Sequence, residues 1–162
     1  PIIPGSSLKG AARNAAWRIL KECEGGIYVE GATKFEIDEK VVNEIFDSPG
    51  GGEGRVVFVG GYPVGPLPPN GALFETDVLT PHYQPYYQNP KNPPPADFYA
   101  PNPVEFLCVP RGVKYEFILA DRRNFNKVVA CKELDLAEAL LKITLTDFAV
   151  GAMTDEFYGY FE

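Results

Sequence analysis

The sequence is poor in the side chains that most often carry acid–base and metal chemistry. It holds one histidine, His82, and three cysteines that lie far apart: Cys23, Cys108 and Cys131. No two of these residues have the close spacing of a zinc-binding pair, and no carboxylate cluster has the spacing of metal ligands. We therefore expect no metal and no cofactor. The odd number of cysteines favours reduced thiols in a cytoplasmic protein.

Basic residues are also in the minority. Lys and Arg total 15 against 22 Asp and Glu, which gives a net charge of −7. This balance argues against a protein whose whole surface attracts nucleic acid. An RNA contact would have to come from a local basic patch, while the acidic surface could dock on basic protein neighbours. No signal peptide and no apolar run of membrane length occurs, so we expect no membrane partner.

Glycine and proline, by contrast, are abundant at 16 residues each, so much of the chain is expected to be loop. Twelve prolines lie between Tyr62 and Pro103, where no periodicity is sustained. We predict a single domain over residues 1–162 with a loop-rich insertion at about 60–103, and such long loops are usually functional or disordered. Because the first residue is Pro and a helix follows almost at once, we also expect that an N-terminal segment is missing.

The most informative segment is the run Pro4–Arg13. Its first two residues form a turn dipeptide in which Gly5 can adopt backbone angles that other residues avoid. Ser6 or Ser7 is then expected to cap a helix with its side-chain oxygen. The start of a helix offers unpaired N–H groups and partial positive charge, which suit a phosphate.

Two cations lie just inside this helix start. Lys9 and Arg13 are four residues apart and so share one helix face. Gly10 between them would let another backbone, of protein or nucleic acid, come close. The alternative is that these cations form an ordinary solvated face, or that they pair with nearby carboxylates or with a neighbouring subunit.

Periodicity and turn residues predict the other elements. A helix over 7–22 carries a buried stripe at helical spacing, made of Leu8, Ala12, Ala15 and Ile19. The other predicted helices are 38–46 and 136–147, the second capped by Asp135. The predicted strands are 27–29, 33–37, 55–59, 104–109, 113–119 and 158–161, with a flexible connector at 48–54.

The predicted strands 104–109 and 113–119 read as a hairpin, with Gly112 in its turn. In the second strand, alternation places one set of residues on one face: Val113, Tyr115, Phe117 and Leu119. With one further strand supplied by the missing N-terminal segment, the element order becomes β-α-β-β-α-β. This order predicts an α+β, ferredoxin-like (RRM-like) domain whose antiparallel sheet has helices on one face and a free face opposite.

Several stretches carry a family resemblance. The run Ile3–Gly10 followed by Arg13 resembles the PGSSLKGxxR segment of the RAMP superfamily of CRISPR-associated proteins. Gly54–Pro63 is similar to the strand that follows in that family. Further stretches resemble one RAMP subfamily in particular, a subunit of the Cmr-type (type III-B) effector complex near the 3′ portion of the guide RNA: 77–83, 86–87 and 101–107.

The resemblance implies a RAMP domain that binds guide CRISPR RNA, helps to position target RNA and contacts other RAMP subunits. Its implied RNA-binding residues at the helix start are Gly5, Ser6, Ser7, Lys9 and Arg13. His82 and Tyr83 are further RNA-binding candidates. Tyr86 and Tyr87 are expected to stack on bases or on a neighbouring subunit, or simply to hold the insertion to the domain.

The C-terminal segment Gly151–Phe161 resembles the glycine-rich loop of RAMP proteins, roughly GxGxKTxxGYGxF. The matching residues are Gly151, Thr154, Tyr158, Gly159 and Phe161. Ala149 and Phe157 replace glycines of that pattern, and Met153 replaces its lysine. Because Asp155 and Glu156 add negative charge, we expect subunit contact or packing here at least as much as RNA binding.

These features favour a non-catalytic subunit of a type III-B CRISPR effector in antiviral defence. Two alternatives stay open. One is a RAMP endoribonuclease that processes guide RNA, with His82 as general base and Asp77 orienting it, although no second histidine is present to act as acid. The other is a protein-only scaffold that never touches RNA.

Overall fold

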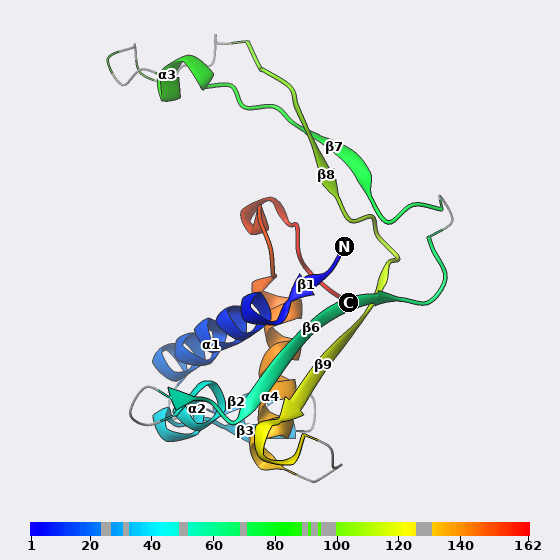
Figure 1. Cartoon of the computed structure of the whole chain (residues 1–162). Helices are drawn as coiled ribbons and strands as arrows, with labels where there is room; N and C mark the ends of the chain where they lie inside the picture. The colour runs from blue at the N-terminus through cyan, green and yellow to red at the C-terminus, as the bar shows by residue number, and fades with distance from the viewer. Residues whose placement is uncertain are drawn as a thin grey trace. The chain divides into compact units, whose positions relative to one another are not determined.

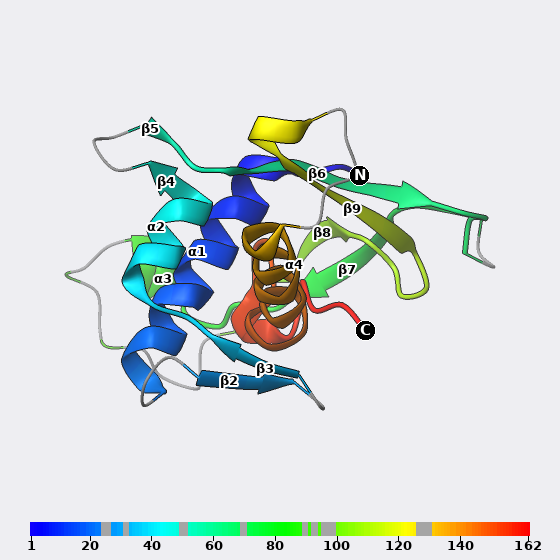
Figure 2. The ribbon, with the colours of Figure 1, turned by 90° about the horizontal axis from the view of Figure 1, so that it is seen from below.

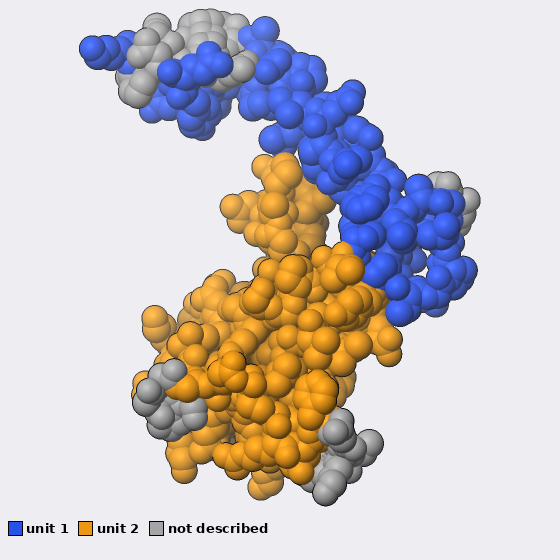
Figure 3. All heavy atoms as spheres, viewed as in Figure 1, with its two compact units in different colours: residues 1, 63–114 blue, residues 2–62, 115–162 orange. Residues whose placement is uncertain are grey.

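The chain folds into two compact units (Figure 3). The larger comprises residues 2–62 and 115–162, and the smaller comprises residues 63–114 with Pro1. The computed structural model describes the following residues (Figure 1): 1–23, 27–30, 33–48, 52–68, 71–88, 91, 94, 100–125 and 131–162.

A three-stranded sheet forms the framework of the larger unit, in the order β1 (Ile3–Pro4), β6 (Val56–Val64) and β9 (Lys114–Asp121). β1 runs antiparallel to β6, with Ile3 opposite Gly61. The prediction of a strand at 55–59 in the middle of the sheet is therefore confirmed. A two-residue strand, β1, directly precedes the first helix, and the expectation that a further N-terminal segment is missing stays a prediction.

β6 and β9 also run in opposite directions. The Arg122 N–H donates to the Arg55 carbonyl at 2.9 Å, at one end of the pair. At the other end Gly61 lies against the ring of Phe117. The sequence separation of contacting residues thus shrinks along the strands, as antiparallel pairing requires.

Three helices lie on one side of this sheet (Figure 2). They are α1 (Gly5–Glu22), α2 (Glu39–Phe46) and α4 (Lys132–Ile143). The predicted stripe of α1 is confirmed, since Leu8, Ala12, Ala15 and Ile19 are at most 4% exposed. The core also takes in Phe46 and Phe58, whose rings stack 5.7 Å apart.

On β9 the predicted alternation is confirmed. Tyr115, Phe117 and Leu119 are half-buried, while Glu116 and Ile118 between them are exposed. On β6, Val59 is likewise exposed. One face of the sheet therefore packs on helices and the other presents side chains to solvent. The finer four-stranded ferredoxin-like order stays a prediction.

Two short ladders flank α2. β2 (Ile27–Glu30) pairs antiparallel with β3 (Thr33–Glu36), which confirms the strands predicted at 27–29 and 33–37. β4 (Asp47–Ser48) pairs with β5 (Gly52–Glu53), and this ladder overlaps the stretch 48–54 that was predicted to be a flexible connector; residues 49–51 lie outside the described residues.

A side chain caps α2, which the sequence analysis did not predict, whereas the predicted cap of α4 is wrong. Asp38 caps α2, because its carboxylate accepts a hydrogen bond from the Val41 N–H at 2.7 Å. Asp135 does not cap α4, which begins at Lys132 with Cys131 as its N-cap residue and no side-chain cap. The acidic side chains of Glu133 and Asp135 instead lie in the first turn, where their negative charge interacts favourably with the helix dipole.

The C-terminal strand predicted at 158–161 is not formed. α4 continues as a π-helical turn, η3 (Thr144–Phe148), and a short 3₁₀ turn follows, η4 (Thr154–Glu156). Phe161 then packs on the rings of Phe117 and Tyr115, with centroid distances of 5.3 and 5.6 Å. Aromatic packing rather than strand pairing fixes this end of the chain.

The smaller unit contains β7 (Glu75–Leu79), a short helix α3 (Gln84–Gln88) and β8 (Val104–Cys108). β8 pairs antiparallel with β7, with Glu75 opposite Cys108 and Leu79 opposite Val104. The hairpin predicted between 104–109 and 113–119 is therefore wrong. Both runs are strands, but the turn at Gly112, whose φ is +89°, joins strands of different sheets.

Candidate nucleic-acid interface

The start of α1 packs directly on the backbone of β6. Gly5 is buried, and a Cβ atom there would overlap the carbonyl oxygen of Phe58. Only glycine lets a helix come this close to a strand. The first turn of α1 is therefore held firmly at the sheet, which fixes the direction in which its free N–H groups point.

No side chain caps this helix start. The N-cap residue is Pro4, and the first turn contains no acidic residue. The predicted serine cap is wrong because the helix begins two residues earlier than expected, so Ser6 and Ser7 lie inside its first turn, and both are exposed. The first N–H groups of a helix have no partner within it, so this end keeps unpaired donors and positive potential.

The two predicted cations differ in their surroundings. Arg13 forms an ion pair with Asp47, with Nη2 2.6 Å from Oδ2 and side chains 47% and 38% exposed. A nearby carboxylate thus pairs with Arg13, as the alternative reading expected for both cations. Lys9 is half-buried, and no ion pair of Lys9 is found among the described residues. Gly10 between them is exposed, and a Cβ atom there would meet nothing within 4 Å.

The tyrosine-rich candidates belong to the smaller unit, not to the unit that contains α1. His82 is exposed and its ring lies 6.4 Å from that of Tyr83, tilted by 54°. Tyr86 and Tyr87 on α3 make an edge-to-face pair at 5.5 Å, and Tyr87 is 74% exposed. These rings offer aromatic faces to a partner.

The C-terminal candidates lie in a loop closed by its own backbone. The Val150 N–H donates to the Gly159 carbonyl at 2.9 Å, and the Tyr158 N–H donates to Met153 at 3.3 Å. Gly159, with φ of +79°, is tightly placed because a Cβ atom would overlap the Val150 carbonyl. Gly151 has open space around it, and Thr154 begins η4. The loop is thus a built structure within the larger unit.

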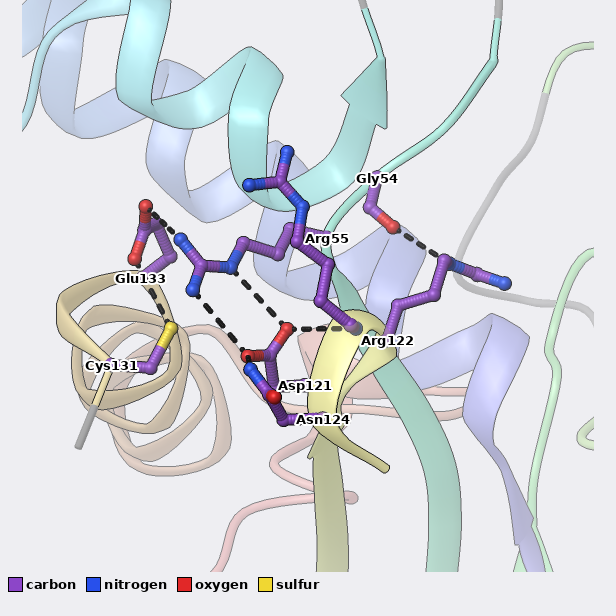
Figure 4. A network of polar contacts seen from close by, with 8 residues as sticks. Gly54, Arg55, Asp121, Arg122, Asn124, Cys131 and Glu133 are labelled. Atoms are coloured by element: carbon purple, nitrogen blue, oxygen red, sulfur yellow. Dashed lines mark hydrogen bonds and ion pairs between the residues drawn. The ribbon is translucent and has the colours of Figure 1, made fainter. Parts of the chain in front are cut away.

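A polar network that the sequence did not reveal surrounds Arg55 (Figure 4). Its guanidinium contacts Asp121 at 3.3 and 3.4 Å and Glu133 at 2.5 Å. Asn124 donates a further hydrogen bond to Asp121 at 3.0 Å. These partners lie 66 and 78 residues from Arg55 along the chain, so no local spacing could have predicted them.

The network sets the protonation of its members. Hydrogen bonds from Arg55 and Asn124 lower the pKa of Asp121 to about 2, while the bond to Asp121 raises the pKa of Arg55. The Cys131 thiol donates to Glu133 at 3.1 Å, which lowers the pKa of Glu133. Burial and this hydrogen bond raise the pKa of Cys131, so its thiol stays protonated and unreactive.

A cleft of about 430 Å³ opens beside this network. Its charged lining residues are Glu44, Asp47, Glu53, Glu133, Arg55, Arg122 and Arg123. Arg122 pairs with Glu53 at 2.5 Å, and Arg55 is held as described, so most of the positive charge is already neutralised. With four carboxylates against three guanidinium groups, the cleft does not favour a polyanion.

The described residues contain neither a metal-binding cluster nor a membrane-spanning helix. No group of three or more His, Cys, Asp and Glu side chains among them is arranged to hold a metal ion. None of the helices in that part of the chain has the length and apolar character needed to span a bilayer.

Comparison with known proteins supports the family resemblance. The model of the RAMP superfamily matches residues 1–162. The CRISPR system Cmr subunit Cmr6 of Pyrococcus furiosus is 31% identical over an alignment that covers 98% of this chain and 57% of the relative. The chain thus spans a little over half the length of that relative.

Structure comparison gives the same result. The crystal structure of Cmr6 from Pyrococcus furiosus matches with a TM-score of 0.59 and 27% identity, covering 98% of this chain and 81% of the other. The matched family model extends over the helix start, the central strand and the C-terminal loop described above. The chain belongs to the RAMP superfamily.

Proposed function

We propose that this protein is a non-catalytic, Cmr6-like subunit of a cytoplasmic type III-B CRISPR effector that binds the 3′ region of the guide RNA and neighbouring RAMP subunits in antiviral defence. One observation carries the RNA-binding part: the uncapped start of α1, with exposed Ser6 and Ser7 and no acidic residue in the first turn. In a chain with a net charge of −7, this is a local site of positive potential.

A phosphate group satisfies the needs of this site. It accepts hydrogen bonds from the free N–H groups, and Lys9 and Arg13 supply charge along the same helix. Such contacts recognise the backbone without reading bases. Sequence choice then comes from base pairing between guide and target RNA.

The ion pair of Arg13 with Asp47 is compatible with this function. Both side chains are more than a third exposed, and exposed ion pairs contribute at most about 1 kcal/mol. A phosphate can therefore compete with Asp47 for the guanidinium. In this proposal Asp47 keeps Arg13 in position until RNA replaces it.

The non-catalytic role rests on the histidine content. RNA cleavage by side chains usually needs an acid and a base, and His82 is the sole histidine of the sequence. The exposed Tyr86 and Tyr87 suit base stacking or docking on a neighbour. We therefore assign Tyr86 and Tyr87 a binding role and not a catalytic one.

Reversing both cations tests RNA binding. In the assembled effector, Lys9→Glu with Arg13→Glu should weaken guide-RNA retention and reduce the slope of log K against log salt by roughly 1–2, since up to two phosphate contacts are lost. Filter binding across a salt titration measures both quantities.

The matched control is Lys21→Glu with Lys132→Glu, which has the same charge change on exposed residues elsewhere in the larger unit. If the control and the test variant lose guide RNA equally, the effect comes from net charge alone and the start of α1 is not the RNA-binding site. Circular dichroism melts check that both variants are folded.

Removing the competing carboxylate should have the opposite effect. Asp47→Asn frees Arg13, so guide RNA should bind roughly two- to fivefold more tightly, the factor expected from an exposed ion pair. The gain should vanish when Arg13→Gln is added. Tighter binding that persists without Arg13 would show that Asp47 acts through general repulsion.

A further inference from the structure

The C-terminal loop, residues 149–161, contains unusual backbone conformations. Three non-glycine residues have positive φ: Ala149 at 61°, Met153 at 62° and Phe157 at 65°. Such angles bring Cβ too close to the backbone and disfavour residues other than glycine. The loop's internal hydrogen bonds, and that from the Phe161 N–H to the Leu145 carbonyl at 2.9 Å, hold it in this form.

The described residues provide no stabilising ring contact to the side chain of Phe157. Its side chain is 87% exposed, and no ring contact of Phe157 is found among the described residues. It therefore combines a strained backbone with a large apolar surface in water, and glycine at this position would remove both disadvantages. We therefore expect the ring of Phe157 to bind a partner outside the chain.

The charge around Phe157 indicates the chemistry of that partner. Residues 143–162 contain four carboxylates and no lysine or arginine: Asp147, Asp155, Glu156 and Glu162. Asp155 and Glu156 directly precede the ring and are exposed. This surface repels a polyanion such as RNA and favours a protein surface that carries cations. Tyr160, 45% exposed, adds a second ring to the same loop.

We infer that Phe157 is the anchor of a protein–protein contact: it inserts into an apolar pocket, bordered by Lys or Arg, on a neighbouring subunit of the effector. The inference rests on the proposed function for the existence of such neighbours. A buried aromatic anchor ringed by complementary charge is a common centre of binding energy at interfaces. The strained backbone holds the ring out in its binding position before the partner arrives.

The test is Phe157→Gly, measured in two ways. In the isolated protein the melting temperature should rise by roughly 2–4 °C, because the positive φ is no longer strained. Binding to the purified neighbouring RAMP subunits without RNA should weaken at least about tenfold, as for a lost interface anchor. Opposite changes in stability and affinity distinguish an anchor from a residue that merely supports the fold.

Phe125→Gly is the matched control, since Phe125 is 63% exposed but has an ordinary φ of −53°. It should not raise the melting temperature and should leave subunit binding unchanged. Phe157→Tyr, which keeps a ring, should retain most of the affinity. Neutralising Asp155 and Glu156 should reduce the salt dependence of subunit association.

The outcomes separate this inference from the proposed function. If Phe157→Gly binds its neighbours as well as the parent does, the inference is overturned while the proposed function stands. If only guide-RNA retention falls, Phe157 stacks on a base instead, and the protein pocket is again excluded. If the parent itself binds no RAMP subunit, it is the proposed function that fails.

Discussion

Gly5→Ala is expected to destabilise the larger unit by about 3 kcal/mol or more. The new Cβ atom would overlap the carbonyl oxygen of Phe58 and lie 2.8 Å from the carbonyl carbon of Val59. Both are backbone atoms of the central strand, so α1 would have to move away from the sheet, and overpacking of this kind is among the costliest substitutions. Urea unfolding followed by circular dichroism measures the loss.

Gly10→Ala is the matched control on the same helix. A Cβ atom at Gly10 meets nothing within 4 Å, and alanine is the better helix former, so the free energy of unfolding should rise by about 0.5–1 kcal/mol. A similar loss for both variants would show that α1 does not rest on β6 as described.

Arg55→Met is the second substitution with a large expected effect. It leaves the carboxylates of Asp121 and Glu133 without their cation, and Asp121 is only 6% exposed. We expect a loss of about 2–3 kcal/mol in the free energy of unfolding near neutral pH. Lys142→Met, which breaks an ion pair with Glu138 that is 60% and 61% exposed, should cost less than about 0.5 kcal/mol.

The same network predicts an acid dependence. The pKa of Asp121 is about 2 in the folded chain against an ordinary 3.8, so the unfolded chain binds more protons between these values. Stability from this group is fully present above about pH 4 and is lost as the pH falls towards 2. Urea midpoints from pH 6 to pH 2 should therefore fall more steeply for the parent than for Arg55→Met. Parallel curves would contradict this assignment.

Local patterns predicted those elements whose partners are dictated by burial. The apolar stripe of α1 lies in the core, and so do Val56 and Phe58 of the predicted strand 55–59. The helix predicted over 38–46 was likewise found within one residue of its observed bounds. In these places short-range sequence and long-range packing agree.

The errors arose where the partner of a segment is not near it in sequence. β8 and β9 are adjacent strands, which favoured a hairpin, but the partner of β8 is β7 in the proline-rich region. β7 reads Glu-Thr-Asp-Val-Leu, with little of the apolar alternation that marks a strand. The Arg55 network was missed for the same reason, since ion pairs across tens of residues leave no spacing signal.

The helix-start site was predicted in part. The predicted segment does contain the beginning of α1, but the serine cap is wrong because the helix already begins at Gly5, which packs on β6 in a contact that local sequence does not report. In the C-terminal loop, the resemblance marked Ala149 and Phe157 as departures from glycine, and the structure shows both with positive φ. The family pattern thus located unusual backbone that composition alone could not.

The antiparallel pairing of β6 with β9 affects how the segment between them can change in evolution. Residues 63–114 leave from the end of one strand and return into the beginning of its direct neighbour. The two ends of this segment are therefore neighbours, as the two ends of a hairpin turn are. The segment can lengthen, shorten or be exchanged between relatives without re-threading the helices and sheet beneath it.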